Sequence, residues 1–288
     1  MVQNSHFNKK TSPSQIKSQF DGASKKDKTS WGGVASWYDD LLKGENTYQK
    51  EVILPNLLRM MDIKTGDKII DIACGQGFFS REFNKLGAVV YGTDISKELI
   101  DIANKNSPLS IKYFVSNARK LSFSENESFD KATIILASQN MESFGVVLSE
   151  CFRILKPKGE LYLVINHPSF RVPQKSDWGY DEERKIQYRF VEQYMSEIMT
   201  KIDMNPGEKD PRNKNYTVSF HRPLQNYFRD FKNTGFCVKD LEEWVSNRKS
   251  QAGTRQKAED KARKEIPLFM CIEAVKIVHP IKLLPMFV

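Results

Sequence analysis

The 288-residue sequence lacks the signals of a membrane protein, a secreted protein and a metalloprotein. No stretch approaches the roughly 18 consecutive apolar residues that a membrane-spanning helix requires, and residues 1–6 do not resemble the beginning of a signal peptide. The few cysteines lie far apart and form no C-x-x-C pair, which predicts reduced thiols rather than disulfides or a zinc site; they are Cys74, Cys151, Cys237 and Cys271. We therefore expect a cytoplasmic protein with no membrane span and no metal site.

Composition and charge describe one globular unit with a basic tail. Hydrophobic residues make up 40% of the chain, charged residues 28% and aromatic residues 11%, which is enough for a sizeable core in one domain. Half of the net charge of +8 lies in residues 1–30, where six lysines face two aspartates, and this polar segment predicts a disordered basic tail. A second basic excess, in residues 246–265, indicates either a solvated helix face or a phosphate-binding surface.

A glycine-rich turn is the most informative motif in the chain. An apolar run at 68–70 leads into residues 71–80, which contain Gly75 and Gly77 and continue into an amphipathic stretch. This pattern predicts a strand, a glycine turn and a helix. Glycines let the backbone approach a ligand closely, and the helix N-terminus offers unpaired N–H groups to a polar or anionic moiety. A tight strand-to-helix connection without a ligand is the alternative interpretation of this turn.

An aspartate at the end of the next apolar run complements the turn. Residues 88–93 lead to Asp94, seventeen positions after Gly77. A carboxylate at the tip of a second strand beside a glycine turn can accept both hydroxyls of a ribose, so the pair predicts a bound adenosine-type nucleoside. The structural alternatives are a helix cap at Asp94, just before Ile95, and a helix N-terminal charge at Asp71.

The segments that follow give the chain a resemblance to a known family. They are a short apolar run at 111–115, the sequence Asn117-Ala118-x-x-Leu121-Ser122-Phe123, a β-branched run at 129–137, and Lys156-Pro157-x-Gly159 before the apolar run 160–165. Over roughly residues 34–165 this order resembles the class I S-adenosylmethionine-dependent methyltransferases, particularly the branch similar to the ubiquinone and menaquinone methyltransferases. Two positions depart from the family pattern: Ala73 stands at the first glycine, and Asn117 stands at a common aspartate, where its amide oxygen can still accept a hydrogen bond from adenine.

The resemblance implies an α/β fold, with a Rossmann-like, seven-stranded, mostly parallel sheet, helices on both faces and an antiparallel last strand. It also implies S-adenosylmethionine as the cofactor. The cofactor-binding residues that it implies are Asp71, Ala73, Gly75 and Gly77 around the methionine part, Asp94 and Ile95 at the ribose, Asn117 and Ala118 at adenine, the Ala137 backbone at the amino group, and Tyr38 from a lid.

The expected organisation is a single methyltransferase domain at 31–288 behind the tail. It comprises lid helices at 31–61, a core at 62–165, a β-flap insertion at 166–220, and a C-terminal core with a helical insertion at 221–288. In the flap, residues 186–194 alternate like a strand and are expected to pair with 216–220 above the carboxyl ends of the sheet. The C-terminal part is expected to open with a helix that has Pro223 in its first turn and Gly235 at its C-cap, followed by strands at 237–244 and 268–276.

The acceptor side offers several candidates and no single choice. His167 and His221 are the candidate general bases, because an unperturbed imidazole titrates near neutral pH, and Asp177 is a further candidate. Arg171 could recognise an anionic acceptor, and the aromatic side chains of the flap could stack on a planar one; these are Trp178 and Tyr180.

We expect a small or medium-sized organic molecule as the methyl acceptor, and nothing in the sequence predicts the oligomeric state. A second possibility is an RNA or protein methyltransferase that uses the basic segments. Residues 137–140 are not the N-P-P-Y type of sequence that is typical of enzymes that methylate the amino groups of nucleic-acid bases. A nicotinamide-dependent oxidoreductase and a non-catalytic cofactor-binding protein are the remaining alternatives. Ser80 stands where a dinucleotide turn would have its third glycine, which disfavours the oxidoreductase.

Overall fold

The structure is a computed structural model that describes residue 44, residues 46–204, residue 207, residues 209–210 and residues 214–277. The predicted basic tail, the first part of the predicted lid and Tyr38 lie outside the described residues.

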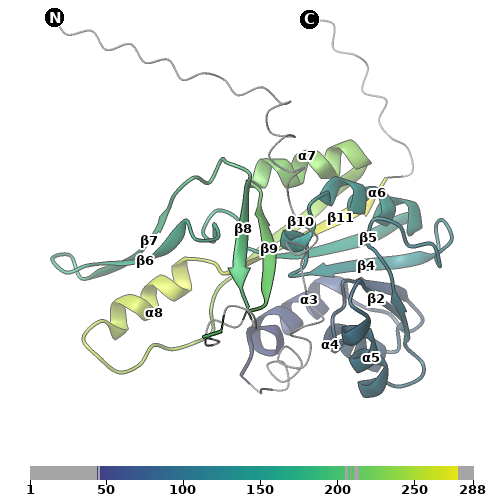
Figure 1. Ribbon diagram of the computed structural model, residues 1–288, viewed down its shortest axis with the longest axis horizontal. Coiled ribbons are helices and arrows are strands. Elements are labelled where there is room, and N and C mark those ends of the chain that lie inside the picture. The colour runs from purple at the N-terminus through teal and green to yellow at the C-terminus, as the bar shows by residue number, and fades with distance from the viewer. Residues whose placement is uncertain (1–43, 45, 205–206, 208, 211–213, 278–288) are drawn as a thin grey trace, which may run out of the picture.

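Seven strands form one sheet in the order β10-β11-β5-β4-β1-β2-β3 (Figure 1). Their bounds are β1 Lys68–Ile72, β2 Val89–Asp94, β3 Lys112–Val115, β4 Phe129–Ile135, β5 Leu155–Asn166, β10 Phe236–Trp244 and β11 Phe269–Lys276. The pairs among the first five strands are parallel, whereas β11 is antiparallel to both β5 and β10. This arrangement confirms the predicted sheet. Its strand order reverses between β1 and β4, and open α/β sheets bind ligands beyond the carboxyl ends at such a switch point.

Helices cover both faces of this sheet. Their bounds are η3 Gln49–Ile53, α3 Leu54–Met61, α4 Phe78–Lys85, α5 Lys97–Asn106, η4 Ser138–Asn140, α6 Phe144–Ile154, α7 Leu224–Thr234 and α8 Gln256–Glu265. The apolar sides of α6 and α7 pack on one face, and those of α3 and α4 pack on the other. Because successive residues of a strand point to opposite faces, Leu161 and Leu163 of β5 enter the first core while Tyr162 and Val164 enter the second.

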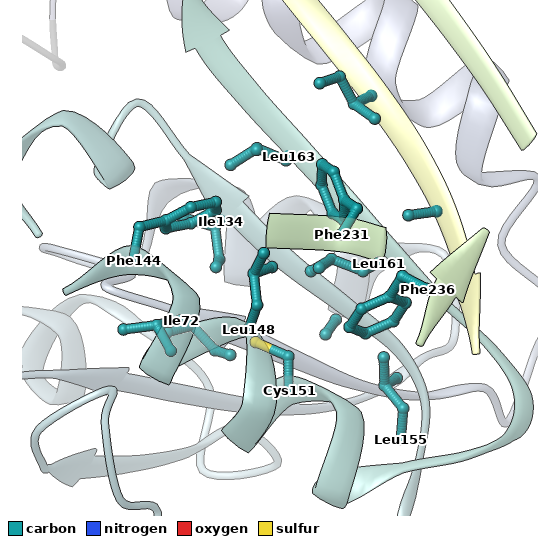
Figure 2. Packing of buried hydrophobic residues seen from close by; sticks show 14 of the residues in the cluster. Ile72, Ile134, Phe144, Leu148, Cys151, Leu155, Leu161, Leu163, Phe231 and Phe236 are labelled. Carbon is teal, nitrogen blue, oxygen red and sulfur yellow. The ribbon is translucent and has the colours of Figure 1, made fainter. Parts of the chain in front are cut away.

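The core beneath α6 and α7 packs tightly against the main sheet. Figure 2 shows Phe144 and Leu148 of α6 beside Ile134 of β4 and Leu163 of β5, with Phe231 of α7 close by. Each of these side chains is at most 1% exposed. The ends of the strands are therefore fixed points on which a binding site can be built.

Glycines at two helix ends have a left-handed backbone. Gly77 precedes α4 with φ of 81°, and Gly235 ends α7 with φ of 91°. The predicted C-cap of α7 is thereby confirmed. Pro223, expected in the first turn of this helix, is its N-cap; a proline suits this boundary because it has no N–H to leave unpaired.

The predicted pairing of the flap is wrong. β7 (Ile186–Val191) pairs with β6 (Ser176–Asp181), and β9 (Tyr216–His221) pairs with β8 (Ile198–Asp203), so the insertion holds two separate hairpins. The sequence interpretation passed over β8, whose six residues do not alternate regularly between apolar and polar. Pairing with β6 closes a connection of a few residues, which costs less chain entropy than the long loop that the expected pairing required.

The two hairpins lie at different places relative to the sheet. In Figure 1 the β6–β7 hairpin extends away from the sheet beside α8, against which β7 packs, whereas β8 and β9 stand next to the edge where β4 and β5 end. Arg255, just before α8, forms an ion pair with Glu182 and lies over the Tyr180 ring. Part of the basic excess at 246–265 is therefore used in packing the extension.

Candidate functional site

The glycine turn after β1 has a backbone that few residues other than glycine adopt easily. Ala73 and Gly75 both have φ of 57°, and Gly77 has φ of 81°. A Cβ on Gly77 would lie 2.3 Å from the Tyr113 hydroxyl, so this glycine also makes room for a side chain of β3. The sequence interpretation assigned the glycines to ligand approach and missed this packing requirement.

Asp94 ties the turn to the end of β2. One carboxylate oxygen accepts the Gly75 N–H at 3.0 Å, and the other accepts the Ser96 N–H at 2.9 Å. The side chain is 7% exposed, and burial raises its pKa despite these amide hydrogen bonds. Each oxygen keeps a second lone pair, so the carboxylate can still accept hydroxyl donors. Ile95 follows with 65% of its surface exposed and offers an apolar surface on which a planar base can rest.

Asp71 lies beneath the turn rather than at its surface. It is 2% exposed, and its two oxygens accept the Ser80 hydroxyl at 2.6 Å and the Thr133 hydroxyl at 3.0 Å. Burial raises its pKa to about 6 against the opposing effect of those hydrogen bonds. Asp71 therefore links β1 to α4 and β4, and it shapes the turn from below.

The segment after β3 lies beside Asp94. The Ser116 N–H donates to the Asp94 carbonyl at 2.8 Å, which holds β3 in register with the end of β2. Asn117 is exposed, and its amide oxygen accepts the Arg119 N–H at 2.9 Å. Ala118 packs against the edge of the core. The structure thus brings the predicted ribose and adenine residues to one edge of the sheet.

The loop after β4 completes this edge. Leu136 has φ of 52°, and its carbonyl accepts the Gln139 side-chain N–H at 2.5 Å. Ala137 follows, and its carbonyl accepts the Asn140 N–H at 2.9 Å. The Gln139 side-chain oxygen is buried and has no hydrogen-bond partner among the residues that the structure describes. Such an acceptor suits a bound cationic donor, and no feature of the sequence pointed to Gln139.

The β8–β9 hairpin is anchored to the same loop. The Asn140 side chain donates to the Thr217 hydroxyl at 3.0 Å and to the Val218 carbonyl at 2.8 Å. Arg222, which follows β9 and is 7% exposed, donates to the carbonyls of Ser138 at 3.3 Å and Glu142 at 2.7 Å. The hairpin therefore covers the carboxyl ends of β4 and β5 in a fixed position. Sequence reasoning missed both anchoring residues.

A cavity of about 40 Å³ lies between the hairpin and the ends of these strands. Its lining residues come from the loop after β4, the end of β5 and β9; they are Gln139, Ile165, Asn166, Pro168, Arg171, Pro173, Ser219, Phe220, His221, Arg222 and Tyr227. Two predicted acceptor-side residues, Arg171 and His221, meet here.

The two candidate bases differ in their hydrogen bonds. His167 is 3% exposed, and its Nδ1 accepts the Ser169 N–H at 3.2 Å while its Nε2 pairs with Glu243 at 2.5 Å. His221 has only one ring nitrogen so engaged in the part of the chain that the structure describes: Nε2 lies 2.8 Å from the Tyr194 carbonyl. Because a carbonyl only accepts, Nε2 carries the proton and Nδ1 keeps its lone pair. Burial lowers the pKa of His221, which keeps it neutral near pH 7.

The remaining acceptor-side candidates lie elsewhere. Trp178 and Tyr180 belong to β6 and lie under Arg189 and Arg255, with cation-to-centroid distances of 5.2 Å and 4.4 Å. Asp177, also on β6, is exposed and accepts the Trp178 N–H. These three side chains do not line the cavity beneath β8 and β9.

Features of other protein classes are missing from the part of the chain described. All four cysteines are free thiols, and within the described ranges no group of histidine, cysteine and acidic side chains is arranged to hold a metal ion. None of the helices described here has the length and apolar character of a membrane span.

Sequence comparison finds relatives over the central part of the chain. Residues 70–163 match the family model for a methyltransferase domain. The demethylmenaquinone methyltransferase of Paenarthrobacter aurescens is 29% identical over 146 residues, 51% of this chain and 53% of the relative. The ubiquinone biosynthesis O-methyltransferase of Xanthomonas oryzae pv. oryzae is 30% identical over 101 residues, 34% of this chain and 42% of the relative. The chain thus spans about half the length of these curated relatives.

Structural comparison agrees over a larger part of the chain. An S-adenosylmethionine-dependent methyltransferase from Mesorhizobium loti has a TM-score of 0.61 and 23% identity, and the match covers 77% of this chain and 96% of that chain. At this identity the likeness concerns the fold. Residues 70–163 therefore match a methyltransferase domain, and the fold of the chain is similar to that of S-adenosylmethionine-dependent methyltransferases.

Proposed function

We propose that this protein transfers a methyl group from S-adenosylmethionine to a small or medium-sized organic acceptor. The observation that carries the proposal is the hydrogen bond from the Gly75 N–H to Asp94, which joins the glycine turn and the ribose-type carboxylate at one edge of the sheet. This hydrogen bond also closes the turn, and what favours a ligand is that the Asp94 oxygens keep lone pairs for hydroxyl donors.

The residues at this edge fit the donor. Asp94 has lone pairs left for the ribose hydroxyls, the exposed Ile95 suits a face of adenine, and Asn117 and Ala118 lie beside it. The buried side-chain oxygen of Gln139, which has no partner within the described ranges, suits the ammonium group of the methionine part. Asp71 acts indirectly by holding the turn, and Tyr38 remains a proposed lid contact.

Little covalent help from the protein is needed, because the bound donor supplies a methyl group that its sulfonium charge already activates. The protein must hold the acceptor in line and exclude water, and positioning of this kind can supply most of the rate acceleration. The anchored β8–β9 hairpin is suited to this role because it covers the end of β5, where the cavity lies.

We assign the general base to His221. Its Nε2–H is held by the Tyr194 carbonyl, so that Nδ1 is the nitrogen that can take a proton from an acceptor hydroxyl or amine. His167 would have to give up its bond from the Ser169 N–H to do the same. The names of the relatives, which refer to demethylmenaquinone and to ubiquinone biosynthesis, support an organic acceptor of modest size.

Transfer of labelled methyl groups to separated cell fractions tests this proposal. The full chain is incubated with methyl-labelled S-adenosylmethionine and, in parallel, with a small-molecule fraction, total RNA or total protein. We expect label in the small-molecule fraction, and we expect Asp94→Ala to abolish it. Label in RNA or protein alone would contradict the proposed acceptor class while keeping the donor.

A matched control separates loss of donor binding from loss of fold. Asp101→Ala removes an exposed carboxylate on α5 that pairs with Lys97, so this variant should transfer label as the unchanged chain does. Circular dichroism of both variants checks that the sheet and helices are retained.

A further inference from the structure

Arg171 is a cation that has no side-chain partner among the residues that the structure describes, and it lies in the cavity beneath the β8–β9 hairpin. It lies in the short segment between β5 and β6, where its backbone N–H donates to the His167 carbonyl at 2.9 Å. Its side chain is half-buried and lines the cavity. Across the described ranges, its guanidinium forms neither an ion pair nor a hydrogen bond.

Neighbouring arginines are satisfied, which sets Arg171 apart. Arg189 donates to the Ser176 hydroxyl at 3.0 Å and to the Phe170 carbonyl. Arg222 donates to carbonyls of the loop after β4. A guanidinium has five N–H donors, so leaving those of Arg171 half-buried and unpaired has a free-energy cost that a bound acceptor group would remove.

The cavity wall is positive. Two arginines line it and no aspartate or glutamate does, while the uncharged polar groups include Asn166, Ser219 and Gln139. Burial, and then the charge of Arg189, lower the pKa of Arg171. The surroundings of Arg171 therefore disfavour its positive charge. A bound anion would offset this unfavourable effect.

The shape of the site selects the kind of anion. A volume of about 40 Å³ holds a functional group rather than a whole molecule. A planar guanidinium fork matches a planar carboxylate, to which it can donate two parallel hydrogen bonds. His221 lines the same cavity. The acceptor would therefore carry its anionic group close to the nucleophilic atom that His221 would deprotonate.

We propose that Arg171 is the anion-binding residue of the acceptor site and that the methyl acceptor carries a carboxylate group. This inference rests on the proposed function, because it names the acceptor class of the same site.

Nuclear magnetic resonance of the arginine side chains tests the inference with a probe small enough for the cavity. The full chain, saturated with S-adenosylhomocysteine, is titrated with formate, with the neutral isostere formamide and with inorganic phosphate, while the arginine Nε–H signals are followed. The signal that disappears in Arg171→Gln is assigned to Arg171. Arg184, an exposed residue of the β6–β7 turn without a side-chain partner among the residues described, is the internal control.

We expect the Arg171 signal to shift and saturate with formate at a concentration at least about tenfold lower than with formamide, as a charge-assisted hydrogen bond predicts. The Arg184 signal should show no saturation. An Arg171 signal that behaves like that of Arg184, or that responds equally to formamide, would overturn the inference. Tighter binding of phosphate than of formate would overturn the assignment to a carboxylate.

Donor binding distinguishes failure of this inference from failure of the proposed function. Arg171→Gln should leave the affinity for S-adenosylhomocysteine within about twofold. A tenfold loss would assign Arg171 to the methionine carboxylate of the donor, which overturns the inference and leaves the proposed function intact. If the unchanged chain fails to bind S-adenosylhomocysteine, the proposed function fails first, and the inference falls with it.

Discussion

Two buried aspartates beside the glycine turn have different roles although they stand at the ends of adjacent strands. Asp94 accepts two backbone amides and remains 7% exposed, whereas Asp71 accepts two hydroxyls and is 2% exposed. The sequence could place both, because each follows an apolar run. It could not separate their roles, because the hydroxyls of Ser80 and Thr133 reach Asp71 only in the folded sheet.

Replacing Asp71 with asparagine should change how stability depends on pH. The folded-state pKa of about 6 lies above the unfolded value of about 3.9. The native state therefore binds more protons between these values, and the Asp71 contribution to stability falls as pH rises through that window. The cost above pH 6 is on the order of 3 kcal/mol.

Urea unfolding at pH 4.5 and pH 7.5 measures this effect. We expect the free energy of unfolding of Asp71→Asn, relative to that of the unchanged chain, to be higher at pH 7.5 than at pH 4.5. Taking the difference between the two proteins cancels the titration of other groups. An unchanged difference across the window would show that Asp71 does not carry a raised pKa.

Replacing His221 with glutamine should remove the base and keep its hydrogen bond. The glutamine amide can still donate to the Tyr194 carbonyl, but it has no basic nitrogen. We expect kcat to fall by about 10² to 10⁴, with affinity for S-adenosylhomocysteine nearly unchanged.

The pH profile of kcat/KM tests the same assignment. Burial, with a contribution from the charge of Arg222, lowers the pKa of His221, so the unchanged enzyme should lose activity only at a pH below that at which an ordinary imidazole titrates. The hydrogen bond to the Tyr194 carbonyl, and then the charge of Glu197, oppose this shift in pKa. The acid limb should vanish in His221→Gln and persist in the control His167→Gln; an acid limb unchanged in the first variant would exclude His221 as the base.

At the scale of elements, patterns within a segment were predictable and pairings between insertions were not. The strand at 269–276 and the C-cap at Gly235 follow from local sequence. The pairing of β7 with β6 depends on a short turn, and β8 has weak alternation, so the competing pairing of 186–194 with 216–220 could not be rejected from the sequence. The anchors Asn140 and Arg222 are ordinary polar residues until the chain folds.

Asn140→Ala should loosen the β8–β9 hairpin without unfolding the sheet. The substitution removes the donors to the Thr217 hydroxyl and the Val218 carbonyl, at a cost of about 1–2 kcal/mol. Hydrogen exchange followed by mass spectrometry should show faster exchange in residues 198–203 and 216–221, with β4 and β5 unchanged. Thr217→Val, which removes one partner only, should give a smaller effect. Equal exchange in Asn140→Ala and the unchanged chain would show that Asn140 does not anchor the hairpin.

At the scale of the whole molecule, one sheet with a core on each face carries the site. Leu163 is fully buried in the core beneath α6 and α7. Leu163→Ala should therefore lower the free energy of unfolding by about 2–5 kcal/mol. Urea unfolding followed by tryptophan fluorescence and by circular dichroism should give coincident transitions if the domain unfolds as one unit. Separate transitions would show that the two faces unfold independently.

The most direct measurement of the central claim is a calorimetric titration of the full chain with S-adenosylmethionine, S-adenosylhomocysteine and NADH, repeated with Asp94→Ala. Both sulfur nucleosides should bind, NADH should not, and the variant should lose at least about tenfold in affinity, since two charge-assisted hydrogen bonds to ribose hydroxyls are removed. Binding of NADH without binding of either sulfur nucleoside would contradict the account.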